Sequence, residues 1–253
     1  MKTIGFIGVG VMGKPMVRNL MKKGFPVSIY TRTKSKVLDV IKEGAVWCDD
    51  VKTCVQDKDV IITIVGYPKD VEEVYFGENG IIANAKPGAV LIDMTTTSPK
   101  LSERIYAETK PRGISALDAP VSGGDSGAKA GTLSIMVGGD REAFDACQDV
   151  FAAMGTNIIY EGGAGKGQHT KMANQIALAG AVASVSEAIA YARRTGLDVE
   201  TMLASISKGA AGSWQNLTGA VTSRVSLTDD MVSNVSVAQV LTRYFVEVDE
   251  PLL

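Results

Sequence analysis

One lysine and one asparagine near residue 170 have the types and the spacing to act together on a polar substrate. Lys171 and Asn174 belong to the segment GKGQHTKMANQ. On a helix they lie about 60° apart, on one face, and Gly167 one turn earlier leaves room there for a ligand. His169, the single histidine of the chain, points about 200° away from Lys171. A lysine ammonium beside an amide can stabilise and protonate a growing oxyanion. A solvated surface lysine is the commoner role of such a residue.

Two expected strand ends carry groups that suit a carboxylated ligand. In DAPVSGGDSG, Ser122, Gly123 and Gly124 follow a strand. Consecutive backbone N–H groups there can form an anion-binding nest, with the Ser122 hydroxyl as a further donor, and α/β proteins bind ligands at such strand ends. An ordinary glycine turn has the same sequence. The segment DMTTTSP, with Thr96 at its centre, ends another strand in hydroxyl groups and would equally serve as a helix N-cap.

The N-terminal segment GVGVMG fits the G-x-G-x-x-G pattern of dinucleotide-binding loops. It lies between an expected strand and an expected helix, which is the context that makes the pattern specific. Gly8 permits the tight turn, Gly10 lets the backbone approach a pyrophosphate, and Gly13 allows the helix to pack closely on the strand. The helix N-terminus then offers unpaired N–H groups and a positive dipole end to the phosphates.

The end of the second expected strand favours NADP(H) over NAD(H). NAD enzymes usually place an acid there, about 20 residues after the loop, whereas an arginine suits a 2′-phosphate. The chain has YTRTKSK at this position, with the hydroxyls of Thr31 and Thr33 around Arg32 and no acid. The forked guanidinium of Arg32 would hold the phosphate. The alternative is a solvated basic turn.

The elements that must position these residues alternate between strand and helix over residues 1–162. Strands are expected at 2–8, 27–32, 59–65, 89–94, 115–120, 132–137 and 157–160, and helices at 11–23, 35–43, 70–75, after Pro99 and at 141–154. This alternation predicts the α/β class with a Rossmann-type doubly wound sheet. A glycine-rich stretch at 162–167 precedes a long helix over 165–194. We therefore predict an NAD(P)-binding Rossmann domain over 1–162 and a helical substrate and oligomerisation domain over 163–253.

The composition excludes several classes of function. A formal net charge of −2 and the lack of a basic cluster argue against nucleic acid as a partner. Three cysteines are too few and too dispersed for a disulfide framework or a thiolate metal site, so no metal is expected. No window has the apolar length of a membrane span, and the N-terminal apolar run is broken by glycines, so we expect a cytoplasmic protein without membrane contact.

Four segments, in their order, resemble the 3-hydroxyisobutyrate dehydrogenase family of β-hydroxyacid dehydrogenases. That family includes tartronate semialdehyde, glyoxylate and succinic semialdehyde reductases. The segments are GFIGVGVMGKPM, DMTTTSP, DAPVSGGDSGAKAGTLSIMVGG and GKGQHTKMANQ, and the similarity spans residues 1–213. The resemblance implies an NAD(P)-dependent oxidoreductase that interconverts a small β-hydroxyacid and its semialdehyde or oxoacid.

The resemblance also implies roles for particular residues. Lys171 would be the catalytic residue, with Asn174 orienting the substrate, and Ser122, Gly123 and Gly124 would bind the substrate carboxylate. Thr96 would contact the cofactor on its nicotinamide side, and the other cofactor contacts would come from Gly8, Gly10, Val11, Met12, Gly13, Val65, Tyr67 and Pro68. Lys171 would protonate the substrate oxygen during reduction. During oxidation a neutral lysine, with an ordinary pKa near ~10.4, would accept the proton, so oxidation should improve at alkaline pH.

The C-terminal part departs from the family pattern. Family members carry a second lysine, in a Lys-Asp pair, in the helical domain, whereas this chain has no lysine after Lys208. After residue 214 the sequence is rich in Val, Ser and Thr, which are poor helix formers, with one amphipathic helix expected over 237–248. We expect a shortened second domain that leaves Ile176, Val182 and Ile189 of the long helix uncovered. The protein should then form a homo-oligomer that buries this helix, or else be poorly soluble. A catalytically weak NADP-binding protein with an incomplete active site is the alternative function.

Overall fold

The structure is a computed structural model and describes residues 1–209. Two compact units make up the chain, the first over Met1–Lys171 and the second beginning at Met172. The boundary predicted from the sequence, between residues 162 and 163, lies at the start of the glycine-rich stretch. The first unit continues past this stretch into the helix that follows it. The assignment of separate functions to two domains stays a prediction. The predicted helix over 237–248 and the tail after 214 lie outside the described residues.

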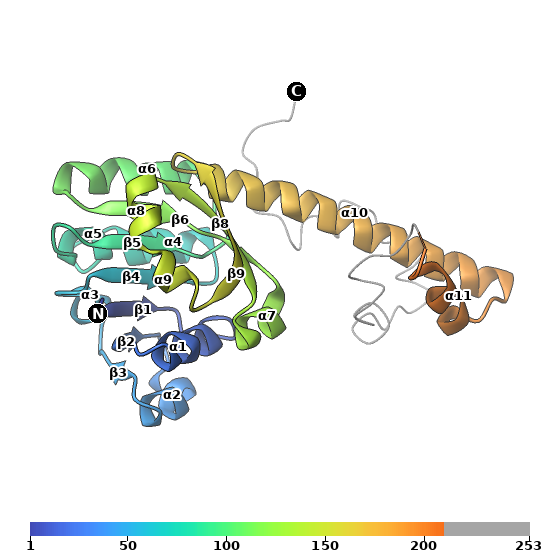
Figure 1. The fold of residues 1–253 in the computed structure, drawn as a ribbon, viewed down its shortest axis with the longest axis horizontal. Helices are drawn as coiled ribbons and strands as arrows, with labels where there is room; N and C mark the ends of the chain where they lie inside the picture. Colours follow the sequence, from blue (N-terminus) through green and yellow to red (C-terminus); the bar gives the residue numbers. More distant parts are fainter. Residues whose placement is uncertain (210–253) are drawn as a thin grey trace. The chain divides into compact units, whose positions relative to one another are not determined.

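The first unit is built on a mixed sheet with the strand order β3-β2-β1-β4-β5-β6-β8-β7, with β9 paired to β8 (Figure 1). Strands β1 to β6 pair in parallel, while β8 runs antiparallel to β6 and β7 and parallel to β9. The order of the first six strands is that of a Rossmann fold, which confirms the predicted fold class. The strands are β1 (Ile4–Ile7), β2 (Val27–Tyr30), β3 (Val46–Trp47), β4 (Val60–Thr63), β5 (Val90–Asp93), β6 (Ser115–Asp118), β7 (Val121–Ser122), β8 (Leu133–Gly139) and β9 (Gly155–Gly162).

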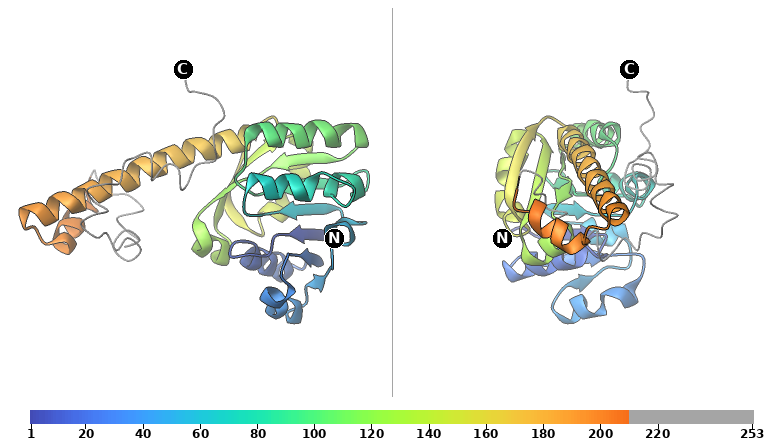
Figure 2. Two further views of the ribbon diagram at one scale, coloured as in Figure 1. Left: turned by 180° about the vertical axis from the view of Figure 1, so that it is seen from behind. Right: turned by 90° about the vertical axis from the view of Figure 1, so that its right-hand side faces the viewer.

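Helices cover both faces of this sheet (Figure 2). Because successive strand residues point to opposite faces, Phe6 and Ile62 belong to one core while Ile7 and Ile61 belong to the other. Burial on both faces explains the continuous apolar runs in the sequence. The first face carries α1 (Gly13–Lys22), α2 (Leu38–Lys42), α7 (Gly124–Ala130), α8 (Arg141–Ala146) and α9 (Gln148–Phe151), and the second carries α3 (Val51–Val55), α4 (Pro68–Tyr75), α5 (Ile81–Asn84) and α6 (Pro99–Thr109).

The periodicity of the sequence missed the shortest elements of the first unit. Strands β3 and β7 and helices α3, α5 and α7 were not expected, because segments of two to seven residues are too short to show a helical or strand period. The helix expected over 141–154 is divided into α8 and α9 at Cys147, whose backbone is not helical. Two single 3-10 turns, η1 (Lys34–Val37) and η2 (Lys110–Arg112), complete the unit.

The long helix α10 (Lys166–Thr195) begins in the first unit and continues into the second, where α11 (Val199–Ile206) follows it. Asp198 caps α11 by accepting a hydrogen bond from the N–H of Thr201 at 2.8 Å. The expectation that Ile189 is uncovered was wrong, because this side chain is 3% exposed and packs in a cluster with residues of α11. Ile176, at 62% exposed, agrees with the expectation.

Helix α10 is also apolar enough, by length and composition alone, to cross a membrane, which the sequence analysis did not expect. In the structure 17% of its most apolar 18-residue window is buried. A single helix of this kind is weak support for a span, because core helices of water-soluble proteins meet the same criterion.

Candidate active site

A cavity of about 590 Å³ lies at the carboxyl ends of β1, β2 and β4. Ligands of open α/β sheets bind at this edge. Eight residues predicted to contact the cofactor line the cavity, namely Gly8, Gly10, Val11, Met12, Gly13, Thr31, Arg32 and Val65. Four others do not line it, namely Thr33, Tyr67, Pro68 and Thr96. The structure therefore brings the loop, the end of β2 and the end of β4 to one hollow.

The glycine loop has the shape that a pyrophosphate needs. Gly8 has a φ of +97°, and a Cβ there would lie 2.1 Å from the carbonyl oxygen of Ile64. A Cβ on Gly13 would lie 2.1 Å from the carbonyl oxygen of Gly8, so α1 starts in close contact with the loop. At Gly10 an added Cβ would meet nothing within 4 Å. The loop is thus tightly packed at Gly8 and Gly13 but open at Gly10, which fits a bound dinucleotide.

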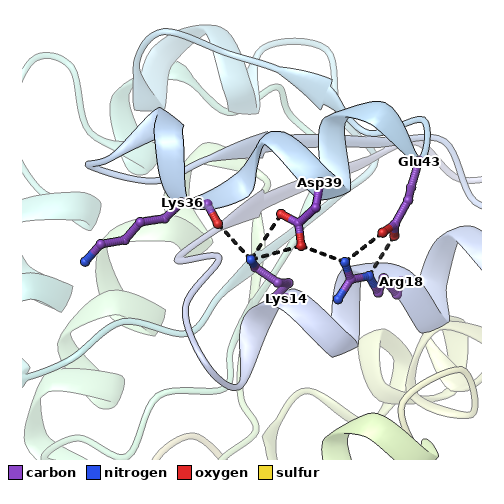
Figure 3. Close-up of polar contacts among 5 residues, drawn as sticks. All are labelled: Lys14, Arg18, Lys36, Asp39 and Glu43. Carbon is purple, nitrogen blue, oxygen red and sulfur yellow. Dashed lines mark hydrogen bonds and ion pairs between the residues drawn. The ribbon is translucent and has the colours of Figure 1, made fainter.

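The turn after β2 is held against α1 by a network of ion pairs (Figure 3). Lys14 donates to the carbonyl oxygen of Lys36 at 2.7 Å and to Asp39 at 3.1 Å. Arg18 donates to Asp39 at 2.8 Å and to Glu43 at 2.6 Å. The hydrogen bond from Lys14, followed by that from Arg18, lowers the pKa of Asp39 to about 2. Exposed pairs of this kind add little stability each, but together they fix the segment that follows Arg32.

Arg32 itself is paired with a carboxylate that the sequence analysis missed. Its guanidinium lies 3.3 Å from Asp70, and the two side chains are 77% and 17% exposed. Asp70 also accepts the N–H of Tyr67 at 3.0 Å, which fixes it in the first turn of α4. Asp70 lines the cavity together with Arg32. The chain has no acid at the end of β2, but the fold brings one there from the first turn of α4.

Lys171 is a buried lysine in the early part of α10. Its side chain is 8% exposed, and Nζ donates to the carbonyl oxygen of Val121 at 2.8 Å. Burial, by removing water from the ammonium, lowers the pKa of Lys171 below its ordinary value. His169 is exposed, so the two side chains have the opposite environments that their positions on a helix predict. A lysine with a lowered pKa releases its proton at a lower pH than a lysine in water, so more of it is the neutral amine at a given pH.

Gly167 does not leave room for a ligand, so that prediction was wrong. A Cβ at this position would lie 2.3 Å from the carbonyl oxygen of Met136 and 2.7 Å from that of Asp118. The glycine instead lets the first turn of α10 pack directly on β6 and β8.

Asp118 anchors the start of α10. Its two carboxylate oxygens accept the N–H groups of Gly165 at 2.7 Å and Gln168 at 2.9 Å. Burial raises the pKa of Asp118, and these backbone donors oppose the shift. A carboxylate at a helix N-terminus satisfies orphan N–H groups and the helix dipole. The sequence analysis missed this role because the donors lie far along the chain from Asp118.

The predicted carboxylate-binding segment lies beside the residue that Lys171 contacts. Ser122 follows Val121 in β7, and Gly123 and Gly124 have φ angles of +127° and +63°. These backbone conformations suit glycine whether or not a ligand binds. In the second unit, the amide of Asn174 donates to Gln175 at 3.0 Å. The roles of these residues toward a substrate stay predictions.

Gln168 is a second residue that the sequence analysis missed. Its side chain is completely buried, donates to the carbonyl oxygen of Thr95 at 2.7 Å and accepts the N–H of Thr97 at 3.0 Å. The hydroxyl of Thr95 in turn accepts the N–H of Val65 at 3.0 Å. Thr96, which is half-buried, lies between the two residues that Gln168 holds. The sequence shows that Gln168 lies three residues before Lys171, but it does not show that Gln168 contacts Thr95 and Thr97.

Asp93 is a buried carboxylate at the end of β5. Its Oδ1 atom accepts the hydroxyl of Thr63 at 2.8 Å and the N–H of Thr95 at 3.1 Å. Its Oδ2 atom has no hydrogen-bond partner within the described part of the chain. Burial raises the pKa of Asp93 to about 6, against the effect of these hydrogen bonds. Within residues 1–209, no group of three His, Cys, Asp or Glu side chains is arranged to hold a metal ion.

Comparison with known proteins identifies the family of this site. A sequence model described as the NAD-binding domain of 6-phosphogluconate dehydrogenase matches residues 3–162. A second model, described as the NAD-binding domain of NADP-dependent 3-hydroxyisobutyrate dehydrogenase, matches residues 165–238. The chain belongs to the 3-hydroxyisobutyrate dehydrogenase family. It is therefore an NAD(P)-dependent oxidoreductase of the hydroxyacid dehydrogenase class, as the resemblance implied.

Similar proteins come from bacteria and from the plant Arabidopsis thaliana. The chain is 60% identical to the uncharacterized oxidoreductase YkwC of Bacillus subtilis, over 84% of this chain and 74% of that protein. It is 37% identical to an NAD-dependent L-serine dehydrogenase of Pseudomonas aeruginosa, over 85% and 72%. A solved structure of the Mycobacterium tuberculosis 3-hydroxyisobutyrate dehydrogenase with L-serine is 32% identical, with a TM-score of 0.77 over 86% of this chain and 74% of that one.

In this member of the 3-hydroxyisobutyrate dehydrogenase family, Asp93 is expected to make stability depend on pH. An unfolded aspartate releases its proton near pH ~3.9, whereas folded Asp93 keeps it up to a pKa of about 6. Between these values the folded state binds more protons, so the free energy of unfolding falls as pH rises, by up to about 1.4 kcal/mol per pH unit. Above this window Asp93 no longer changes the free energy of unfolding with pH, because it is ionised in both the folded and the unfolded state.

Urea unfolding of the wild type and of Asp93→Asn between pH 4 and 7 measures this effect. The asparagine keeps an oxygen for Thr63 and Thr95 but does not titrate, so the difference between the two proteins should change across the window and then level off. If the free energies of unfolding of the two proteins change in parallel with pH, Asp93 is already ionised at acid pH.

Proposed function

We propose that the chain is an NADP-preferring dehydrogenase that interconverts a small β-hydroxyacid and its semialdehyde or oxoacid. Suitable substrates are of the 3-hydroxyisobutyrate, tartronate semialdehyde, glyoxylate or succinic semialdehyde type. The observation that carries the proposal is the buried Lys171, whose Nζ lies 2.8 Å from the carbonyl oxygen of Val121, next to Ser122. Within residues 1–209 this lysine has no carboxylate partner, and burying a charge without one costs stability. Such groups concentrate at functional sites.

In the proposed mechanism Lys171 is the proton donor and acceptor for the substrate oxygen. A bound nicotinamide dinucleotide would supply or accept the hydride. As negative charge grows on the substrate oxygen, the ammonium of Lys171 stabilises it and then delivers its proton. Ser122 and the N–H groups of Gly123 and Gly124 bind the substrate carboxylate, and Asn174 orients the substrate.

The preference for NADP(H) is supported by Arg32 in the wall of the dinucleotide cavity and by the absence of an acid directly after β2. Asp70 opposes it, because a 2′-phosphate placed at Arg32 must compete with this carboxylate. We propose that the phosphate displaces the carboxylate, since it carries more charge and can accept two N–H groups of the guanidinium, whereas Asp70 contacts one of them at 3.3 Å. Thr31 and Thr33 add hydroxyl donors beside it.

The lowered pKa of Lys171 gives a prediction for the pH dependence of the reaction. Oxidation needs the neutral amine, so kcat/KM for oxidation should rise with pH and level off at a pH below the ~10.4 of a free lysine. Initial rates with a hydroxyacid at pH 6 to 11 measure the inflection. An inflection at or above the free lysine value would contradict the idea that a buried Lys171 accepts the proton.

A steady-state assay tests the proposed function directly. NADPH and NADH are each offered with glyoxylate, tartronate semialdehyde and succinic semialdehyde, and NADP⁺ and NAD⁺ with 3-hydroxyisobutyrate and L-serine. Turnover of at least one acid, faster with the phosphorylated cofactor at equal concentration, is the expected result. Nucleotide binding without turnover of any of them would favour the alternative, a catalytically weak NADP-binding protein.

Two further features belong to the proposal. We place the enzyme in the cytoplasm, where the three free cysteines, Cys48, Cys54 and Cys147, all buried, would stay reduced. We also propose that it forms a homo-oligomer through its helical domain, as an apolar helix needs a covering surface. Light scattering of the purified protein measures the oligomeric state.

A further inference from the structure

Gln168 joins two segments on which the proposed function depends. Through Thr95 and Thr97 it contacts the turn after β5, which carries Thr96. Through the backbone of α10 it lies three residues before Lys171. Both segments belong to the first unit. From these contacts we infer that Gln168 is a positioning residue, which sets Thr96 and Lys171 in their relative places without itself touching substrate or cofactor. This inference rests on the proposed function.

The hydrogen bonds of Gln168 restrain the turn on both sides of Thr96. The amide oxygen accepts from the residue after Thr96, and the amide nitrogen donates to the residue before it. Thr95 and Thr97 are 2% and 0% exposed, so water cannot replace either bond. Buried hydrogen bonds without access to water are strong restraints on geometry. The Thr96 side chain is thereby presented from a turn that cannot shift on its own.

Gln168 is also linked to the dinucleotide cavity, through Thr95, and to the sheet, through its own backbone N–H. The hydroxyl of Thr95 accepts the N–H of Val65, which lines the cavity. The backbone N–H of Gln168 donates to Asp118 at the end of β6. One chain of hydrogen bonds therefore runs from the loop after β4, through the turn after β5, to the N-terminus of α10. A residue at the centre of such a chain suits the task of keeping these three segments in register.

Replacement by methionine removes this link and keeps the volume of the side chain. Gln168→Met can neither donate to Thr95 nor accept from Thr97. Gln168→Glu can do both when it is protonated, but when ionised it sets a carboxylate against the carbonyl oxygen of Thr95. Thr109→Val is the matched control, because Thr109 is also fully buried and its hydroxyl donates only within α6.

The test compares how strongly each protein binds the whole cofactor and its adenosine half. The ratio of the Kd of 2′,5′-ADP to the Kd of NADP⁺ reports what the nicotinamide half contributes, and it needs no turnover. We expect Gln168→Met to lower this ratio about tenfold, as for the loss of one or two buried hydrogen bonds, with the Kd of 2′,5′-ADP unchanged. We expect kcat to fall by a similar factor, and a deuterium label at C4 of the reduced nicotinamide to slow the variant more than the wild type.

Each outcome decides the inference. In Gln168→Glu the ratio should return toward the wild-type value as pH falls, while Thr109→Val should keep the wild-type ratio even if it lowers Tm. An unchanged ratio in Gln168→Met, or a wild-type ratio of one, would overturn the positioning role. A wild-type protein with a ratio above one that turns over no hydroxyacid would refute the proposed function. The positioning role of Gln168 would then be judged by the binding ratio alone.

Discussion

Replacing Lys171 by methionine or alanine is expected to lower kcat by about two to four orders of magnitude, as removal of a general acid should. Nucleotide affinity should barely change, because Lys171 does not line the dinucleotide cavity. The ammonium is buried, and its hydrogen bond within the described part of the chain goes to the carbonyl oxygen of Val121. An apolar side chain of similar length should therefore leave the protein equally or more stable. A variant that is stable and inactive separates catalysis from folding.

His169→Ala is the matched control for this experiment. The imidazole lies two residues away on the same helix but is exposed, so its loss should leave kcat within about twofold of the wild type, as for most surface changes. Single-turnover rates, Tm and the Kd of NADP⁺ are measured on the same samples of the wild type, the Lys171 variants and His169→Ala. The assignment of Lys171 as the proton donor fails if His169→Ala is the more damaging substitution.

Replacing Arg32 by alanine is expected to weaken NADPH binding by about 10- to 150-fold and to leave NADH binding nearly unchanged. The range corresponds to about 1.5–3 kcal/mol for a charge-assisted hydrogen bond between guanidinium and phosphate. Because the Arg32 side chain is 77% exposed, salt should reduce the effect. Calorimetric titration of both nucleotides at low and physiological ionic strength measures it.

Asp70→Asn supplies a change in the opposite direction. The asparagine oxygen can still accept the N–H of Tyr67, so the start of α4 stays capped, while the negative charge beside Arg32 is lost. NADPH should bind about three- to tenfold more tightly, as for the removal of one nearby like charge, and NADH should not. Equal affinities of the wild type for NADPH and NADH would contradict the proposed preference, whatever the variants show.

The sequence by itself determined the fold class and predicted where the dinucleotide binds. Continuous apolar strands alternate with amphipathic helices, and the glycine loop follows the first strand, so only local patterns were needed. Lys171 also stood out locally, since its opposition to His169 follows from helix geometry alone. The shortest elements, such as β7 and α7, gave no such signal because they contain less than one full period of a pattern.

Only the tertiary structure decided which side chains meet. Asp70 pairs with Arg32, Asp118 caps α10, and Gln168 holds the turn around Thr96. In each case the partner belongs to a segment far along the chain. The burial of Gly167 against β6 and β8, where the sequence suggested an open face, has the same origin. Local patterns record what a residue prefers next to its neighbours in sequence, whereas hydrogen bonds and desolvation depend on the neighbours that folding brings together.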